Sequence, residues 1–436
     1  MKSFGIFLIA ALLGICMNLS AADWYVSASG GKKKNPGTKE APFRNIHDAV
    51  QKAAPGDVIH IAAGKYAGIL GASEIIIDKA VSLIGSYSPD FSQRDIVNFT
   101  TLIRPANEKN DTKGAGILTL NPPDGPGPDM VIDGLVIDQG CMNSYDTVNG
   151  KPEGVETGMW LTPPAIGAND KFASADVYSI CKPTANRYQG NITIRNCVIA
   201  NSGNFGININ HYVGAVRILN NVFAACRMMS CAVSSSNAYA GTVNVEFAYN
   251  TVLFTWSRTS EMNEMGYGIE CMSKVTSNVH HNIFGLNVFA GVKNDRDDFR
   301  SKSVRLDNNI FFLNRLADVT AVKSPHILKL RVDDESFEDM ADLPGMASVE
   351  GNVSLKDPKA FKGIINEAYL IAFLNANYSE KTDFDPNSPA NVFRSALGID
   401  QRGTIQTEVS MFCNRYPLNE VYKLFGAING FGAQRF

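Results

Sequence analysis

One short phrase recurs through the middle of the chain: an Asn followed by three mostly apolar residues. Its five copies begin at Asn196, Asn221, Asn250, Asn282 and Asn309. The copies are separated by 25, 29, 32 and 27 residues, so the phrase stays constant while the connections vary. Self-similarity on this scale is typical of a solenoid, in which each repeat packs only on its neighbours.

Short alternating runs follow the first phrase and identify the repeat as β rather than helical. No apolar spacing of 3.6 residues is sustained here, whereas apolar and polar residues alternate as in half-buried strands. The runs are Gly206–Asn210, Ala232–Ser236, Gly268–Met272 and Gly291–Asp295, with further runs at Val216–Ile218 and Val243–Phe247. Three strands per repeat, with Asn at a fixed corner, predict a parallel β-helix. Asn suits such a corner because it tolerates the left-handed conformation and forms hydrogen-bonded ladders when stacked.

The N-terminal region predicts the first coils of the same stack. Between Asn45 and Ala54 the apolar residues fall on one helical face, and Pro55-Gly56 ends the helix before a strand begins at Val58. A helix of this kind is suited to cover the open end of a solenoid.

Four segments of this region resemble the opening of a known superfamily. They are Trp24–Ser27, Ala54–Ile61, Gly64–Tyr66 and Val81–Ser88. Together they resemble the first coils of secreted right-handed parallel β-helix proteins of the pectate-lyase-like superfamily. The resemblance implies an all-β fold, a right-handed parallel β-helix with an N-terminal capping helix.

The ends of the chain differ from its middle. Lys2 precedes a short apolar run, and Ser20-Ala21-Ala22 supplies small residues before Asp23, as in a signal peptide. After Lys323 the repeat fades. The expected parts are a signal peptide at 1–22, the β-helix at 23–322 with an insertion at about 141–190, and an irregular, partly helical C-terminal cap or small appended region at 323–436. We expect export to the periplasm, the cell surface or the extracellular space.

Composition excludes two classes of protein. Lys and Arg number 40 against 43 Asp and Glu, so no strong positive field is available to bind nucleic acid. No segment after the N-terminal run is apolar enough over about 20 residues to span a bilayer. Seven cysteines follow the expected signal peptide. Cys141 and Cys181 flank the insertion and could close it, or the cysteines could serve as small buried apolar residues.

The register of the alternating runs predicts which side chains share a face. Neighbouring strands lie about 4.8 Å apart, so equivalent side chains stack in columns. We expect inward side chains at Ile207, Val233, Ile269 and Val292, one outward column of Asn208, Ser234, Glu270 and Lys293, and a second of Asn210, Ser236, Met272 and Asp295. Glu270, Lys293 and Asp295 then cluster on one face, next to a loop with Arg296, Asp297 and Asp298. The alternative is a solvated ladder of surface charges.

The resemblance implies a chemical role for this cluster. Polysaccharide lyases on this scaffold place a Lys or Arg beside carboxylates, where a base abstracts the proton α to a uronate carboxyl group and a cation neutralises the acid. On this hypothesis Lys293 is the base, with Glu270 and Arg296 as the other catalytic residues. The implied cofactor is Ca²⁺, held by Asp295, Asp297 and Asp298.

Substrate contacts are expected beside the same strands. An aromatic ring offers a sugar an apolar face and a polar tip. The predicted binding residues are Trp256, Arg258, Asn208 and Tyr267. The expected partner is a polysaccharide or cell-surface glycan, cleaved by β-elimination if the protein is a lyase of acidic glycans. The sequence carries neither the paired-Asp motifs of the hydrolases nor a lyase Arg motif, which favours the alternative of a non-catalytic structural or adhesive protein outside the cell.

Overall fold

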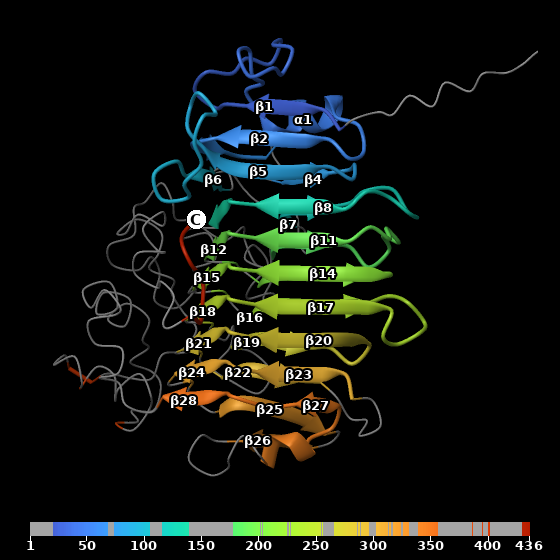
Figure 1. Cartoon of the computed structure of the whole chain (residues 1–436), viewed down its shortest axis with the longest axis vertical. Coiled ribbons are helices and arrows are strands. Elements are labelled where there is room, and N and C mark those ends of the chain that lie inside the picture. The colour runs from blue at the N-terminus through green and yellow to red at the C-terminus, as the bar shows by residue number, and fades with distance from the viewer. Residues whose placement is uncertain are drawn as a thin grey trace, which may run out of the picture.

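The described part of the chain forms three long sheets, and in each sheet the strands are stacked one above another along the long axis of the molecule (Figure 1). Each turn of the coil adds one strand to each sheet. Neighbouring strands within the sheets are parallel, apart from one antiparallel pair at the C-terminal end of one sheet. The computed structural model describes residues 21–68, 74–104, 116–138, 178–200, 202, 204–224, 226, 228–253, 255, 266–285, 287, 289–295, 302–312, 314, 317–323, 326–330, 339–355, 386, 395, 400–401 and 430–436. The predicted right-handed parallel β-helix is confirmed.

The sheets are named A, B and C in the order in which the chain meets them. Sheet A contains β1 (Asp23–Val26), β2 (Val58–Ala62), β5 (Ser82–Tyr87), β8 (Met130–Asp133), β11 (Ile192–Arg195), β14 (Gly214–Leu219), β17 (Val243–Ala248), β20 (Val275–His280), β23 (Val304–Asp307) and β27 (Met346–Ser348). Sheet B contains β3 (Gly64–Tyr66), β6 (Thr101–Ile103), β9 (Val136–Asp138), β12 (Val198–Ala200), β15 (Val222–Ala224), β18 (Thr251–Leu253), β21 (Ile283–Gly285), β24 (Ile310–Phe312) and β28 (Val353–Leu355). Sheet C contains β4 (Ile75–Ile77), β7 (Gly116–Leu120), β10 (Tyr178–Lys182), β13 (Phe205–His211), β16 (Met229–Ser235), β19 (Tyr267–Cys271), β22 (Ala290–Asn294), β25 (Ala317–Lys323) and β26 (His326–Leu330).

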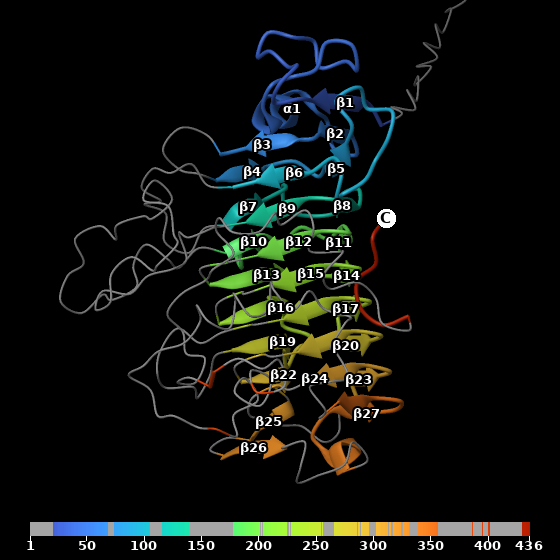
Figure 2. The same ribbon diagram turned by 90° about the vertical axis from the view of Figure 1, so that its left-hand side faces the viewer.

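The predicted N-terminal helix is α1 (Ile46–Lys52), which contacts β1, β2 and β4. Ile46, Ala49 and Val50 on its inner face are buried, as the apolar spacing predicts. Figure 2 shows it beside the first strands, at one end of the stack. Among the described residues, no helix has the length and apolar character needed to cross a membrane.

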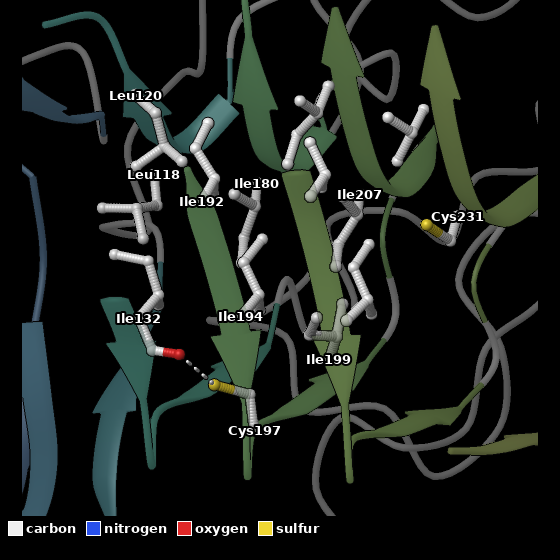
Figure 3. Packing of buried hydrophobic residues seen from close by; sticks show 14 of the residues in the cluster. Leu118, Leu120, Ile132, Ile180, Ile192, Ile194, Cys197, Ile199, Ile207 and Cys231 are labelled. Carbon is white, nitrogen blue, oxygen red and sulfur yellow. Dashed lines mark hydrogen bonds between the residues drawn. The ribbon is translucent and has the colours of Figure 1, made fainter. Parts of the chain in front are cut away.

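The interior of the coil is a continuous apolar core. Inward positions on successive strands are filled by β-branched and aromatic residues, and Figure 3 shows part of this column, including Ile180, Ile194 and Ile207. Four Phe rings continue the stack at centroid distances of 5.8, 6.1 and 5.3 Å, in the order Phe223, Phe247, Phe284 and Phe311. One continuous core explains why most of the described chain needs no division into separate domains.

A ladder of Asn side chains runs down the corner between sheets A and B. Its buried members are Asn221, Asn250, Asn282 and Asn309, and Asn352 adds a further rung. From Asn250 onward, each Oδ1 accepts from the main-chain N–H and the Nδ2 of the Asn one rung earlier, as Asn250 does from Asn221 at 2.9 and 3.1 Å. Each Nδ2 also donates to a main-chain carbonyl, such as Asn250 to Ile218 at 2.9 Å. The predicted Asn ladder is therefore present.

The left-handed conformation belongs to a different column, one residue before the ladder. Its members are Asn196, Asn220, Tyr249, His281 and Asn308, with φ between 53° and 57°. Asn196 is thus in the left-handed column, and Cys197 occupies the ladder position, because Val198 pairs with Val222. The first phrase was predicted to align Asn196 with Asn221, and that alignment is wrong by one residue.

The solenoid differs from the sequence-based boundaries at two places. β10 lies within the range predicted as an insertion, yet it pairs with β7 and β13 in sheet C. Beyond residue 322, β27 and β28 add strands to sheets A and B, while sheet C ends in the antiparallel pair β25–β26. Most of the insertion, the signal peptide and most of the predicted C-terminal cap lie outside the described residues.

The middle strands of sheet B are buried on both faces, whereas β3, β6 and β28 at its ends are not. Every residue of β9, β12, β15, β18, β21 and β24 is buried, whether it faces the core or away from it. Sheet A instead alternates buried residues with half-buried or exposed ones, as in β14 and β20. Sheet C is mostly buried as well, and in β19 and β22 the residues that are half-buried rather than buried are Glu270 and Lys293.

Candidate functional site on sheet C

The predicted outward column is present on sheet C with one member changed. Glu270 of β19 pairs directly with Lys293 of β22, as the register predicts. One strand earlier, however, Asn208 pairs with Ala232 and not with Ser234. Ser234 pairs instead with Asn210, so it replaces Ser236 in the second predicted column.

The misalignment comes from an unrecognised core residue. In β16 it is Cys231 that pairs with Ile207 and Ile269 at the inward position, while Val233 pairs with Ile209 and Cys271. Val233 is buried as predicted, but it lies two residues along the strand from its predicted partners. A shift of two residues preserves the inward or outward direction of a side chain, and for this reason the rest of the column is unaffected.

Lys293 and Glu270 form a closed ion pair on this face. The Lys293 ammonium donates a hydrogen bond to Glu270 Oε1 at 2.6 Å. The two side chains are only 18% and 10% exposed, so the pair is shielded from solvent more than an ordinary surface ion pair. The ammonium also lies 5.7 Å from the centre of the Tyr267 ring, within the range of a cation–π contact.

The Tyr267 ring contacts the Lys293 ammonium but is itself buried. It is 1% exposed and packs against Phe289, with ring centres 4.6 Å apart. A Cβ on the next residue, Gly268, would lie 2.9 Å from Phe284, so Gly268 faces the core, as the following Ile269 does. Tyr267 belongs to the buried cluster outside that core, so the alternation of side chains is interrupted at the start of β19. The prediction that Tyr267 is an exposed sugar platform is wrong, because its neighbours cover the ring.

A row of apolar side chains borders the charged column. The buried cluster of Met229, Ala232, Tyr267, Phe289, Ala290 and Ala317 is separate from the core inside the coil. Phe205 packs against it at half exposure, and the Tyr178 ring lies 5.8 Å from Phe205 with an edge-to-face tilt. The half-buried rings of Phe205 and Tyr178 lie at the starts of β13 and β10, three residues before the row that contains Asn208. Tyr178 was missed because it lies in the range read as an insertion.

Five predicted site residues lie outside the described residues: Arg296, Asp297, Asp298, Trp256 and Arg258. Asp295, at the end of β22, is the described member of the predicted calcium set, and its main-chain N–H donates to the Cys271 carbonyl. Calcium takes six to eight oxygen ligands. Within the described ranges, no group of three or more His, Cys, Asp or Glu side chains is placed to hold a metal ion. The calcium site therefore stays a prediction.

Sequence reasoning missed a buried polar group at the corner where sheet C turns toward sheet A. Lys182 is 2% exposed, and its ammonium donates to the carbonyls of Asn186 and Asn210 at 2.6 and 2.8 Å. Burial lowers the pKa of Lys182 to about 8, and the Asp124 carboxylate opposes this shift. His211 is fully buried nearby, and burial together with Lys182 lowers its pKa to about 4. Both side chains are buried, and Lys182 links the C-terminal end of β10 to that of β13 through the Asn210 carbonyl.

The described cysteines are core residues. Cys181, Cys197, Cys226, Cys231 and Cys271 are all buried. Cys226 and Cys231 are both reduced, and burial raises the pKa of the Cys226 thiol to about 11, so it is inert as a nucleophile. The predicted bridge between Cys141 and Cys181 involves a residue outside the described ranges.

Known proteins match this chain only distantly. A family profile described as a protein of unknown function (DUF1565) matches residues 29–92. No curated protein matches.

Among solved structures, pectin methylesterase PemA from Erwinia chrysanthemi is 10% identical over 78% of this chain and 91% of its own, with a TM-score of 0.34. A rhamnogalacturonan lyase is 11% identical over 94% of this chain and 99% of its own, with a TM-score of 0.32. Pectate lyase Pel9A is 12% identical over 70% of this chain and 80% of its own, with a TM-score of 0.29. At such distances the activity has to be argued from the residues of the site. From its own strand topology, the chain is a right-handed parallel β-helix, the fold that its sequence resemblance implied.

Proposed function

We propose that the outer face of sheet C binds an acidic polysaccharide, with Lys293 as the group that receives a uronate carboxylate. One observation carries the proposal: the Lys293 ammonium is fixed on this face by Glu270 at 2.6 Å and by the Tyr267 ring. A preorganised cation loses little conformational entropy when a carboxylate binds. The Glu270 carboxylate already accepts a hydrogen bond from Lys293, which shows that the ammonium is positioned to bind a carboxylate.

The surroundings of Lys293 fit a chain of sugars. Asn208 and Glu270 lie in the same column, two strand spacings or about 9.6 Å apart with Ala232 between them, and offer an amide and a carboxylate to hydroxyl groups. Phe205 and Tyr178 supply half-buried rings on the same sheet, at the starts of β13 and β10. An aromatic ring can pack against the apolar face of a sugar. The resemblance of the N-terminal region to secreted polysaccharide-acting proteins supports the same class of ligand.

The finer activity we propose is β-elimination, with Lys293 as the base. In the closed pair, the Lys293 ammonium already holds its proton against Glu270 and has no lone pair with which to accept another. Elimination therefore requires that the substrate opens the pair and that Lys293 loses its proton before it takes the proton α to the uronate carboxyl group. Lys293 would first release its ammonium proton to water. The α proton would then pass to Lys293, its bonding electrons would form the new C=C bond, and the glycosidic oxygen would leave with the electrons of the broken C–O bond and take a proton from water.

Binding is tested by titrating the full chain with oligomers of an acidic glycan at low salt, using calorimetry. Lys293→Met should weaken binding by about ten-fold or more, because one charge-assisted hydrogen bond is lost. Glu270→Gln should tighten it, since the ammonium no longer has a competing anion. Lys274→Met is the matched control, because Lys274 is an exposed lysine in the turn before β20. Equal affinity in all four proteins would remove Lys293 from the site.

Catalysis is tested separately, by following the absorbance of unsaturated products from a panel of uronate polymers with and without Ca²⁺. Wild-type activity that disappears in Lys293→Ala supports the lyase. Binding without any product on every polymer contradicts the lyase and supports a second candidate, a non-catalytic adhesive protein. The Glu270–Lys293 ion pair favours that candidate, because in this pair Lys293 already donates to Glu270 and is not available as a base.

A further inference from the structure

The C-terminal residues 430–436 lie along the corner between sheets A and B. They are drawn in red beside β12 and β15, next to the C label (Figure 1). The segment contacts side chains far away in the sequence: residue 434 bonds to Asn220, 214 positions earlier. It passes His281, then Thr251, then Asn220 and finally Arg94, so it runs back toward the first turns of the coil.

The corner holds the main chain of this segment at three successive turns. The Gly432 N–H donates to the His281 carbonyl at 2.8 Å, and the Ala433 N–H donates to Thr251 Oγ1 at 2.9 Å. Asn220 then uses both ends of its amide on one residue: Oδ1 accepts from the Gln434 N–H at 2.6 Å and Nδ2 donates to the Gln434 carbonyl at 2.8 Å. This pairing is the pattern by which an extended peptide adds to a receptor through its main chain.

Side chains make the corner selective for a particular sequence. The Phe431 ring stacks on His281 with centres 5.6 Å apart. A Cβ on Gly432 would lie 2.6 Å from both Ile283 and Thr251, and its φ of +77° disfavours any other residue.

The far end of the segment is fixed by two charged contacts. The Arg435 guanidinium bonds to the Asp95 carboxylate. The Arg94 guanidinium lies 4.9 Å from the centre of the Phe436 ring, within reach of a cation–π contact. Gln434 is held through its main chain, and its exposed side chain makes none of these contacts.

We propose that this corner is a binding site for an extended peptide with the pattern Phe-Gly-Ala-x-Arg-Phe, and that the chain's own C-terminus is its occupant. A segment that belongs to the same chain as its site is held there at an effective concentration on the order of millimolar. A free peptide with a Kd of about 10 µM would therefore be docked about a hundred to one when it is part of the same chain. The site lies on sheets A and B and is independent of the glycan proposal for sheet C.

The site is tested in the full chain by expelling the tail and offering the peptide separately. Gly432→Val should undock the tail, because the new side chain collides with Ile283 and Thr251. A fluorescent peptide with the sequence of residues 430–436 should then bind this variant at least about ten-fold tighter than it binds the wild type, whose own tail competes. Gln434→Ala is the matched control and should behave as the wild type.

Two further measurements separate recognition from general stickiness. Adding Asn220→Ala to the Gly432→Val chain should weaken peptide binding about ten-fold, since both main-chain bonds to Gln434 are lost. A peptide carrying Val at the position of Gly432 should not bind. Saturable binding of the native peptide alone supports the site, and concentration-dependent dimers of the wild type would show that a second copy can donate the tail.

No binding to the folded Gly432→Val chain, or equal binding of the native and valine peptides, would overturn the proposal. Circular dichroism establishes that each variant is folded. If Gly432→Val fails to fold, the double variant Phe431→Ala and Phe436→Ala releases the tail by removing its two ring contacts, and the same two outcomes apply.

Discussion

Two corners of the same coil accommodate buried polar side chains in different ways. At the corner between sheets A and B, the amides of Asn221, Asn250 and Asn282 are fully buried, and each is bonded to the next. At the corner between sheets C and A, His211 and Lys182 are equally buried, and Lys182 donates to the main-chain carbonyls of Asn186 and Asn210. Repetition explains the difference, because identical groups stacked at the strand spacing satisfy one another, whereas a residue that occurs once depends on the main chain around it.

The largest effect is expected from breaking the ladder. Asn250→Leu removes an amide whose Oδ1 accepts from Asn221 and whose Nδ2 donates to the Ile218 carbonyl and Asn282. Several buried groups then lose their partners, so the free energy of unfolding should fall by about 4 kcal/mol. Urea denaturation measures this loss. Asn278→Ala, on the outer face of sheet A, is the control and should cost less than about 0.5 kcal/mol.

A smaller effect, and one that depends on pH, is expected at the other corner. The folded pKa of His211 is about 4 and its ordinary value is 6.5, so between these values the unfolded chain binds a proton that the folded chain does not. Stability is therefore lost as the pH falls from about 6.5 to 4, by about 3 kcal/mol. His211→Asn should show a shallower loss of unfolding free energy over this window. Parallel curves for the two proteins would show that His211 is not the group responsible.

The smallest effect should be a gain, obtained by lengthening the ladder. Cys197 stands at the head of the ladder, its N–H donates to Asn221 Oδ1, and the Leu135 N–H faces its sulfur. Cys197→Asn should supply a stronger acceptor for Leu135 and a donor for the Ile132 carbonyl, which raises the free energy of unfolding by about 1 kcal/mol. Cys231→Asn places the same amide among apolar side chains, away from the ladder, and should destabilise. A loss in both variants would show that the ladder cannot be extended.

The same contrast explains what the sequence predicts well. The ladder and the Glu270–Lys293 contact were predictable because both follow from a phrase that repeats, and a repeated phrase fixes the register of parallel strands. Asn196 was misplaced by one residue because Cys197 breaks the repeat at its first rung. Ala232 was missed because Cys231 was not recognised as an inward residue.

Features that occur once in the chain could not be predicted from the repeat. Lys182 belongs to a strand that carries neither phrase, so its range looked like an insertion. The burial of Tyr267 depends on Phe289, a packing contact that alternation along one strand does not specify. Docking of residues 430–436 involves hydrogen bonds with residues 151 to 340 positions earlier in the chain, and no periodicity connects the partners.

Hydrogen exchange of the full chain with and without an acidic polysaccharide tests the proposed function most directly. We predict that the glycan slows amide exchange in β19 and β22, the strands that contain Glu270 and Lys293, and that Lys293→Met abolishes this protection. Strands β14 and β17 of sheet A should be unchanged and serve as the internal reference. Protection confined to sheet A, or protection in sheet C that survives Lys293→Met, would contradict a glycan site centred on Lys293.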